Sequence, residues 1–131
     1  MTNLHADLSV LVVDDNEFTR ELIKDSLRDI GIRQVVTTED GEAALKVLGS
    51  KKHPIHLIVC DWDMPNMNGL DLLKRVRSVD SDMPFLMVTG RGTEEDVREA
   101  AEFGVSAYIV KPFSPDQLET KVSTLARRIG K

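Results

Sequence analysis

The chain alternates between short apolar runs and longer segments in which apolar residues recur at helical spacing. Five apolar runs read SVLVV (9–13), QVVTT (34–38), HLIVC (56–60), PFLMV (84–88) and AYIV (107–110). Four of them lack polar alternation, which is typical of strands covered on both faces of a parallel sheet. The more polar QVVTT run is therefore expected at an edge of the sheet.

The segments between the runs carry the apolar stripes of amphipathic helices. The first stripe consists of Phe18, Leu22, Ile23, Leu27 and Ile30. Helix ends are predicted at Gly31, Gly49 and Gly104. The last helix has a start signal, in which Ser114 is the N-cap, Pro115 opens the first turn and Gln117 completes a capping box. Strand followed by helix, five times over, predicts an α/β fold with an open parallel sheet.

Length and composition limit the number of domains, the class of partner and the cellular setting to be considered. A length of 131 residues with 41% hydrophobic residues suits one domain, and we expect it to span residues 1–131. The net charge of −5 argues against nucleic acid or an anionic membrane as the main partner. Cys60 is the only cysteine, so no intrachain disulfide can form and a reducing cytoplasmic setting is expected. A zinc site from His53, His56 and Cys60 is disfavoured, because a strand places such ligands poorly.

Polar side chains stand at the carboxyl ends of four of the five predicted strands. They are Asp14, Asp15, Asp61, Thr89 and Lys111. Each alone fits a helix cap, a turn or a solvated side chain. Their joint placement is harder to assign to capping, because ligands of open parallel sheets bind beyond the carboxyl ends of the strands.

Three neighbouring carboxylates repel one another, and a hard divalent cation would relieve that repulsion. Carboxylate oxygens suit Mg²⁺, and Mg²⁺ points to phosphoryl chemistry. Lys111 and Thr89 could then contact phosphoryl oxygens, and an aspartate could itself be the nucleophile.

Four motifs carry a resemblance to a known family. They are VVDDNEFTR, DWDMPNMNGLDLLKRVR, VTGRGTEEDV and AYIVKPF. From about Ser9 to about Ile129 the chain resembles the receiver domain of two-component response regulators, above all the single-domain chemotaxis regulators of the CheY type. The resemblance implies a flavodoxin-like (βα)5 sandwich with strand order 2-1-3-4-5, for which such regulators are a known example.

The resemblance assigns roles to individual residues. Asp61 matches the phosphoacceptor, Thr89 and Lys111 match its catalytic partners, and Thr89 and Tyr108 match the switch residues. The implied Mg²⁺ ligands are Asp14, Asp15, Asp61 and the backbone carbonyl of Asp63. The family also implies a cis bond between Lys111 and Pro112.

The family further implies a sensor histidine kinase as phosphodonor and a readout face formed by the fourth helix, the fifth strand and the fifth helix. A chemotaxis role would add a flagellar motor switch protein and a phosphatase as partners. Another single-domain phosphorelay or adaptor receiver, or a receiver excised from a longer regulator, remains an alternative. Asn16 and Gly90 depart from the CheY pattern, where phenylalanine and alanine are common.

Three other activities share features with this sequence. A dehalogenase-type phosphatase also uses an Asp-x-Asp motif like that of Asp61 and Asp63, but it places the nucleophile on its first strand. A flavin carrier of the same fold needs a phosphate-binding loop where this chain has the acidic DDNEFT. A receiver that only binds partners is disfavoured, because every residue of the phosphorylation chemistry is present.

The second aspartate of the Asp-x-Asp motif suggests a modulating pair. Arg91 lies two residues past Thr89 and should approach the same opening as Asp63. We expect the two to pair there and to limit the access of water to a phosphoryl group. An exposed pair is worth about 0–1 kcal/mol, so the effect on rate should be modest.

Overall fold

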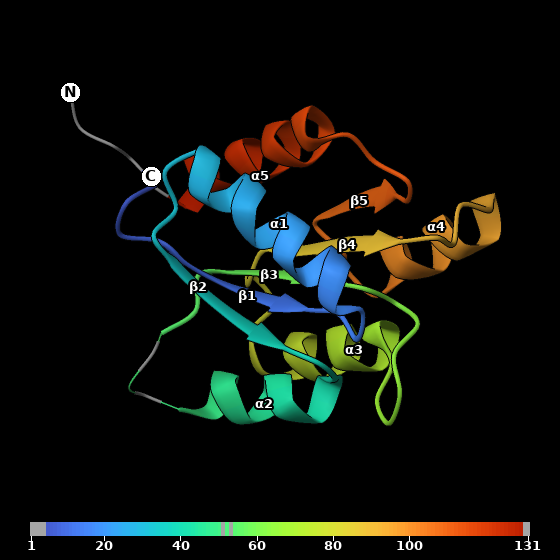
Figure 1. The fold of residues 1–131 in the computed structure, drawn as a ribbon. Coiled ribbons are helices and arrows are strands. Elements are labelled where there is room, and N and C mark those ends of the chain that lie inside the picture. Colours follow the sequence, from blue (N-terminus) through green and yellow to red (C-terminus); the bar gives the residue numbers. More distant parts are fainter. Residues whose placement is uncertain (1–4, 51, 53, 130–131) are drawn as a thin grey trace.

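In the computed structural model, which describes residues 5–50, 52 and 54–129, strands and helices alternate along the chain (Figure 1). The strands are β1 (Ser9–Val13), β2 (Gln34–Thr38), β3 (Leu57–Cys60), β4 (Phe85–Thr89) and β5 (Ala107–Val110). The helices are α1 (Glu17–Asp29), α2 (Gly41–Gly49), α3 (Gly69–Val79), α4 (Glu94–Glu102) and α5 (Pro115–Ile129). The predicted alternation and all five strands are confirmed.

The sheet is parallel throughout, with strand order β2-β1-β3-β4-β5. This is the order that the family resemblance implied, and β2 lies at an edge as its polar sequence predicted. The last residue of β1, Val13, is in register with both Thr38 and Cys60, the last residues of its neighbours. β1, β2 and β3 therefore end level with one another, whereas β4 continues two residues past Met87, the partner of Cys60. The residues that follow the strands lie along one edge of the sheet. The other edge strand, β5, is only partly buried, so the prediction that it is covered on both faces was wrong.

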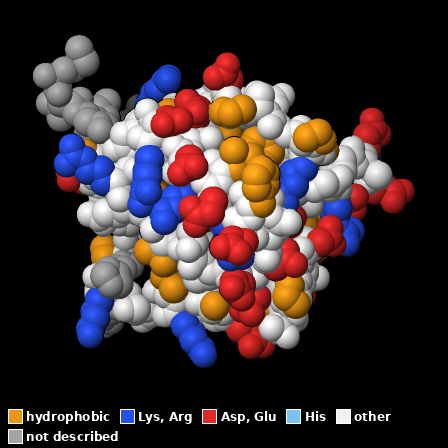
Figure 2. Space-filling model, viewed as in Figure 1, with side chains coloured by type: hydrophobic (Ala, Val, Ile, Leu, Met, Phe, Trp, Pro, Cys, Tyr) orange, Lys and Arg blue, Asp and Glu red, His pale blue; other side chains and the backbone are white. Residues whose placement is uncertain are grey.

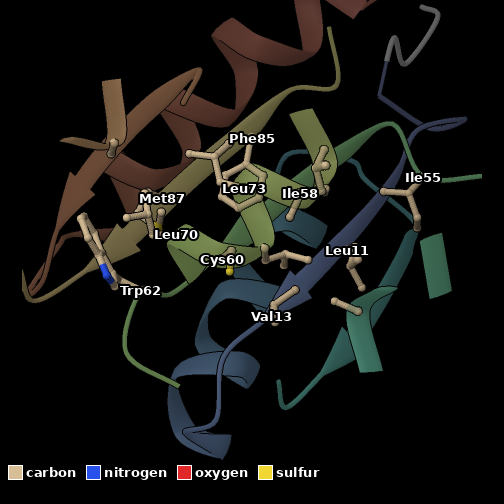
Figure 3. Packing of buried hydrophobic residues seen from close by; sticks show 14 residues of the cluster. Leu11, Val13, Ile55, Ile58, Cys60, Trp62, Leu70, Leu73, Phe85 and Met87 are labelled. Carbon is tan, nitrogen blue, oxygen red and sulfur yellow. The ribbon is translucent and has the colours of Figure 1, made fainter. Parts of the chain in front are cut away.

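Two apolar cores lie on the two faces of the sheet. On one face α1 and α5 cover β1, β3 and β4, and on the other α2, α3 and α4 do so (Figure 1). Figure 3 shows the second core, in which Leu73 of α3 and Phe85 of β4 are buried among strand residues. Trp62, which directly follows Asp61, lies at one end of this core. The loop that carries the candidate nucleophile is therefore anchored by a buried aromatic ring.

The apolar stripe predicted for the first helix is only partly correct. Ile23 and Leu27 are buried, but Phe18 is 77% exposed and Leu22 is also exposed. At 3.6 residues per turn, Phe18 and Leu27 are about two and a half turns apart and point to opposite sides of the helix. Phe18 cannot share the buried face, and it adds apolar surface next to the carboxyl edge of the sheet.

Helix ends follow the predicted signals. Gly31 and Gly104 have φ of 96° and 88°, the left-handed conformation that glycine permits after a helix. Gly49 is the last residue of α2, with Ser50 as its C-cap, so α2 stops where the sequence predicted. At the start of α5, the Ser114 amide donates to Gln117 Oε1 and the Gln117 amide to Ser114 Oγ, which confirms the capping box.

Acidic side chains gather across the middle of the face seen in Figure 2, beside exposed hydrophobic side chains. Within the part of the chain that the structure describes, every helix is too short or too polar to cross a membrane.

Candidate functional site

The strand-end residues predicted from the sequence meet at the carboxyl edge of the sheet. Asp14 follows β1 and is 1% exposed, Asp61 follows β3 and is 8% exposed, and Thr89 ends β4 with no exposed surface. Lys111 follows β5 and reaches back across β4 to the two aspartates. Its Nζ lies 3.0 Å from Asp14 Oδ2 and 3.2 Å from Asp61 Oδ2. One lysine thus bridges residues that are far apart in the sequence.

Backbone hydrogen bonds hold the two aspartates in place. The amide of Asp61 donates to Val13 O at 2.9 Å, and the amide of Asp14 donates to Thr38 O at 3.1 Å, so each continues the ladder of its neighbouring strand. The Trp62 amide donates to Asp61 Oδ1 at 2.7 Å, which leaves Oδ2 for Lys111. The Asn16 amide similarly occupies Asp14 Oδ1. Both carboxylates are oriented by the chain that carries them.

The charges at this edge are strongly coupled. Burial raises the pKa of Asp61, the positive charge of Lys111 opposes that shift, and the negative charge of Asp14 adds to it. Burial would lower the pKa of Lys111, but its hydrogen bond to Asp14 and the charges of both aspartates raise it overall. Lys111 is therefore protonated at neutral pH.

The acidic residues are arranged as a candidate metal site. Asp14, Asp15 and Asp61 each offer a carboxylate oxygen, and these atoms lie within 4.8 Å of one another. All three ligands are oxygen atoms, which suits Mg²⁺. Asp15 is exposed, so the ion could also keep several water ligands, as Mg²⁺ usually does. Among the described residues this is the one group of three or more metal-binding side chains. The disfavoured zinc site includes His53, which lies outside the described residues, and His56 Nδ1 accepts the Ser9 amide.

The predicted switch residues lie on the neighbouring strands. The hydroxyl of Thr89 accepts the amide of Arg91 at 3.3 Å, so it is held by its own loop. Tyr108, on β5, is partly buried, and its hydroxyl donates to the backbone oxygen of Arg91 at 2.6 Å. The Lys111–Pro112 bond is cis, as expected. The backbone of Arg91, in the loop after β4, thus contacts both residues that the family resemblance assigns to switching.

Asp63 and Arg91 form the contact predicted from the sequence. Arg91 Nη2 lies 2.7 Å from Asp63 Oδ1, and Nε lies 3.0 Å from both carboxylate oxygens. The guanidinium also stacks over Trp62 at 4.8 Å and lies 3.7 Å from Asp96. The pair spans the loops after β3 and β4, so it lies beside Asp61. Its effect on chemistry stays a prediction.

Two supports of the site were not found by sequence reasoning. A Cβ atom placed on Gly69 would lie 2.0 Å from the Asp61 carbonyl oxygen, so α3 begins in direct contact with the backbone of the candidate nucleophile. Asn66 has φ of 67° and donates to Asp40 Oδ2 at 3.2 Å. The Asn66 and Asn68-Gly69 positions in PNMNG are turn signals that could have suggested the left-handed residue. No local signal names Asp40 as its partner.

Comparisons with known proteins identify the family of the chain. A family model described as the response regulator receiver domain matches residues 10–123. The chemotaxis protein CheY-3 of Vibrio cholerae is 38% identical over 128 residues, which is 96% of this chain and 97% of that protein. The chemotaxis protein CheY of Pseudomonas aeruginosa is 38% identical over 125 residues, covering 94% of this chain and 99% of that one.

Solved structures show the same fold. A receiver domain of a Francisella response regulator superposes with a TM-score of 0.84 at 31% identity, over 93% of this chain and 98% of that one. The chemotaxis protein CheY4 of Vibrio cholerae superposes with a TM-score of 0.81 at 32% identity, over 90% of this chain and 98% of that one. With a family match over most of its length and relatives above 30% identity, the chain belongs to the response regulator receiver domains.

Proposed function

We propose that this receiver domain is a phosphorylation-dependent switch that accepts a phosphoryl group on Asp61 from a sensor histidine kinase. The observation that carries the proposal is the position of Lys111 Nζ, within 3.2 Å of both Asp14 and Asp61 at a buried sheet edge. Asp61 contacts a lysine and belongs to the acidic group that could hold a metal. This arrangement suits nucleophilic attack by the Asp61 carboxylate on phosphorus.

The chain's own residues would do the following in the transfer. A carboxylate oxygen of Asp61 forms a bond to phosphorus as the bond from phosphorus to the donor nitrogen breaks, and the imidazole of the donor leaves with the electron pair. Lys111 neutralises charge on the phosphoryl oxygens, and the hydroxyl of Thr89 can rotate to donate to one of them. Asp14, Asp15, Asp61 and the Asp63 carbonyl would hold Mg²⁺, which supplies charge stabilisation when bound.

Phosphorylation would then change partner binding. A phosphorylated side chain carries roughly two negative charges at neutral pH, placed here beside Lys111 and Thr89. Because Arg91 connects Thr89 to Tyr108 through its amide and its carbonyl, movement of the Thr89 hydroxyl bears on the tyrosine. Differential contacts of this kind shift the population of two states, and α4, β5 and α5 form the face on which we place the readout.

The phosphorylation step is tested with a small donor. We expect acetyl phosphate and Mg²⁺ to add the mass of one phosphoryl group to the protein and to change the fluorescence of Trp62, the only tryptophan. Asp61→Asn should abolish the mass gain, whereas Asp25→Asn, the same change at an exposed position of α1, should not. A mass gain that survives Asp61→Asn would overturn the assignment. Steady release of phosphate from unrelated phosphoesters would favour the phosphatase alternative.

The relatives named as chemotaxis proteins support a CheY-like role for this chain. We propose a flagellar motor switch protein and a phosphatase as the partners that such a role requires. A pull-down with and without phosphorylation tests this directly. Phosphorylation-dependent capture of a motor switch protein would support the chemotaxis role. Capture of a histidine phosphotransfer protein or another target would favour a phosphorelay or adaptor receiver, or the receiver of a longer regulator.

A further inference from the structure

The corner between β2 and α2, residues 38–41, contacts Asp14 of the acidic site and the loop that follows Asp61. The backbone oxygen of Thr38 accepts the amide of Asp14 at 3.1 Å. Asp40 uses its two carboxylate oxygens separately: Oδ1 accepts the Ala43 amide at 2.8 Å and caps α2, and Oδ2 accepts the side-chain amide of Asn66 at 3.2 Å. The helix cap therefore fixes the carboxylate that holds Asn66.

Asn66 belongs to the loop between β3 and α3, residues 61–68, which also contains the Asp63 carbonyl. Its φ of 67° is a left-handed conformation that asparagine adopts more readily than most residues, although at some cost. The next residue, Met67, packs so closely on the corner that a Cβ atom at Gly41 would lie 2.8 Å from Met67 Cβ and Cγ. Two successive loop residues are thus seated on the corner.

We propose that Asp40 is a positioning residue for the proposed Mg²⁺ site. It acts through Asn66 on the loop that carries the Asp63 carbonyl, one of the proposed ligands. The inference rests on the proposed function, because it concerns the Mg²⁺ site of that function. A carbonyl ligand must be held at a set place for Mg²⁺, which demands near-octahedral geometry. The Asp40 carboxylate, fixed at the N-cap of α2, restricts the loop between β3 and α3 before the ion binds. This reduces the conformational entropy that the loop loses when Mg²⁺ binds.

The charge of Asp40 suits this role at neutral pH. The hydrogen bond from the Ala43 amide, followed by that from Asn66, lowers the pKa of Asp40. The carboxylate is therefore ionised throughout the range in which the site would operate, and its bond to Asn66 is charge-assisted.

Two substitutions separate positioning from simple helix capping. Asp40→Ser keeps an N-cap oxygen for the Ala43 amide but removes the acceptor for Asn66. Asn66→Gly keeps the left-handed backbone, which glycine adopts freely, but removes the amide. Thr93→Ala, which removes the N-cap of α4, and Glu42→Gln, which removes one charge from the first turn of α2, are matched controls.

The experiment titrates each variant with Mg²⁺ alone and follows Trp62 fluorescence, with thermal unfolding measured in parallel. We expect Asp40→Ser and Asn66→Gly each to weaken Mg²⁺ binding by about threefold. Each removes one hydrogen bond, and only part of its free energy affects the ligand, because the bond acts through the loop. The effect of Asp40→Ser should largely vanish in the Asn66→Gly background, because the two residues act through one contact. Thr93→Ala should lower the unfolding temperature without weakening binding, and Glu42→Gln should have a smaller effect than Asp40→Ser.

The outcomes distinguish this inference from the proposed function. If the unmodified protein binds no Mg²⁺, the metal site of the proposed function fails. If it binds Mg²⁺ and the effects of Asp40→Ser and Asn66→Gly on affinity are absent or simply additive, the metal site stands and Asp40 is only a helix cap.

Discussion

Arg91 lies against Asp63 in a bidentate ion pair that joins the loop after β4 to the loop after β3, with 2.7 Å between Arg91 Nη2 and Asp63 Oδ1. The same guanidinium stacks over Trp62, the residue next to Asp61. The carbonyl of Arg91 accepts the Tyr108 hydroxyl. One side chain therefore links the opening of the site to the residues proposed to switch.

The first prediction concerns the lifetime of phosphorylated Asp61. Asp63→Asn weakens the pair with Arg91 and frees the guanidinium, so water should reach the phosphoryl group more easily. Because both side chains are substantially exposed, we expect the rate of phosphate loss to rise by at most about fivefold, the equivalent of 1 kcal/mol. The measurement is the decay of the phosphorylated mass after removal of the donor. Asp96→Asn, which removes the more distant partner of Arg91, is the control. An unchanged decay rate in Asp63→Asn would refute the role of the pair.

The second prediction concerns Gly69, which begins α3 against the Asp61 carbonyl. In Gly69→Ala the new methyl group would meet that oxygen at 2.0 Å, and no side-chain rotation can relieve an overlap with backbone. We expect the free energy of unfolding to fall by about 3 kcal/mol or more, and phosphorylation of Asp61 to slow. Urea unfolding and the mass assay measure the two effects.

Gly49→Ala is the matched control for this glycine. A Cβ at Gly49 meets nothing within 4 Å, so it should stabilise the protein by about 0.5–1 kcal/mol through helix propensity. Equal stability of Gly69→Ala and the unmodified protein would show that α3 can shift at no cost.

The third prediction concerns Thr38, at the end of β2. Its Oγ1 is buried and has no hydrogen-bond partner among the described residues. Thr38→Val keeps the shape and removes an unsatisfied polar atom, so it should stabilise the protein by about 1 kcal/mol. Thr93→Val, which removes a hydroxyl that caps α4, should instead destabilise by about 1 kcal/mol. Denaturant unfolding compares them, and a destabilised Thr38→Val would mean that this hydroxyl does have a partner.

The fourth prediction concerns Tyr108, the only tyrosine in the chain. Burial raises the pKa of Tyr108 from 10.0 to about 12, because the phenolate would lose its hydration. With a folded pKa above the unfolded one, this group favours the folded state fully below pH 10. The contribution is lost as the pH rises from 10 to about 12, because the unfolded chain releases its proton first.

An absorbance titration of the phenolate reports Tyr108 alone. We expect a midpoint of about 12 for the folded protein and about 10 in denaturant, with circular dichroism as the check on folding. A midpoint near 10 in the folded protein would mean that Tyr108 is exposed to water.

Local sequence patterns were enough to predict the order of the strands and helices, because dense apolar runs and helical stripes depend only on neighbouring residues. The polar sequence of β2 predicted its place at an edge of the sheet. The meeting of Asp14, Asp61 and Lys111 required the strand order as well, and that order came from the family resemblance. Parallel strands bring the residues at their carboxyl ends to one edge of the sheet, and the long side chain of Lys111 then spans β4 to reach Asp61 and Asp14. The Asp63 and Arg91 contact followed in the same way from the loops that carry them.

Features that depend on packing between distant segments became visible only in the folded structure. The exposure of Phe18 is a different case, because helical spacing alone turns it away from Leu27 and the predicted stripe was drawn too wide. The contact of Gly69 with the Asp61 carbonyl and the hydrogen bond between Asp40 and Asn66 join segments whose separation is set by how α2 and α3 pack on the sheet. Local propensity carries no information about such distances, because they result from the sum of many side-chain contacts across the core.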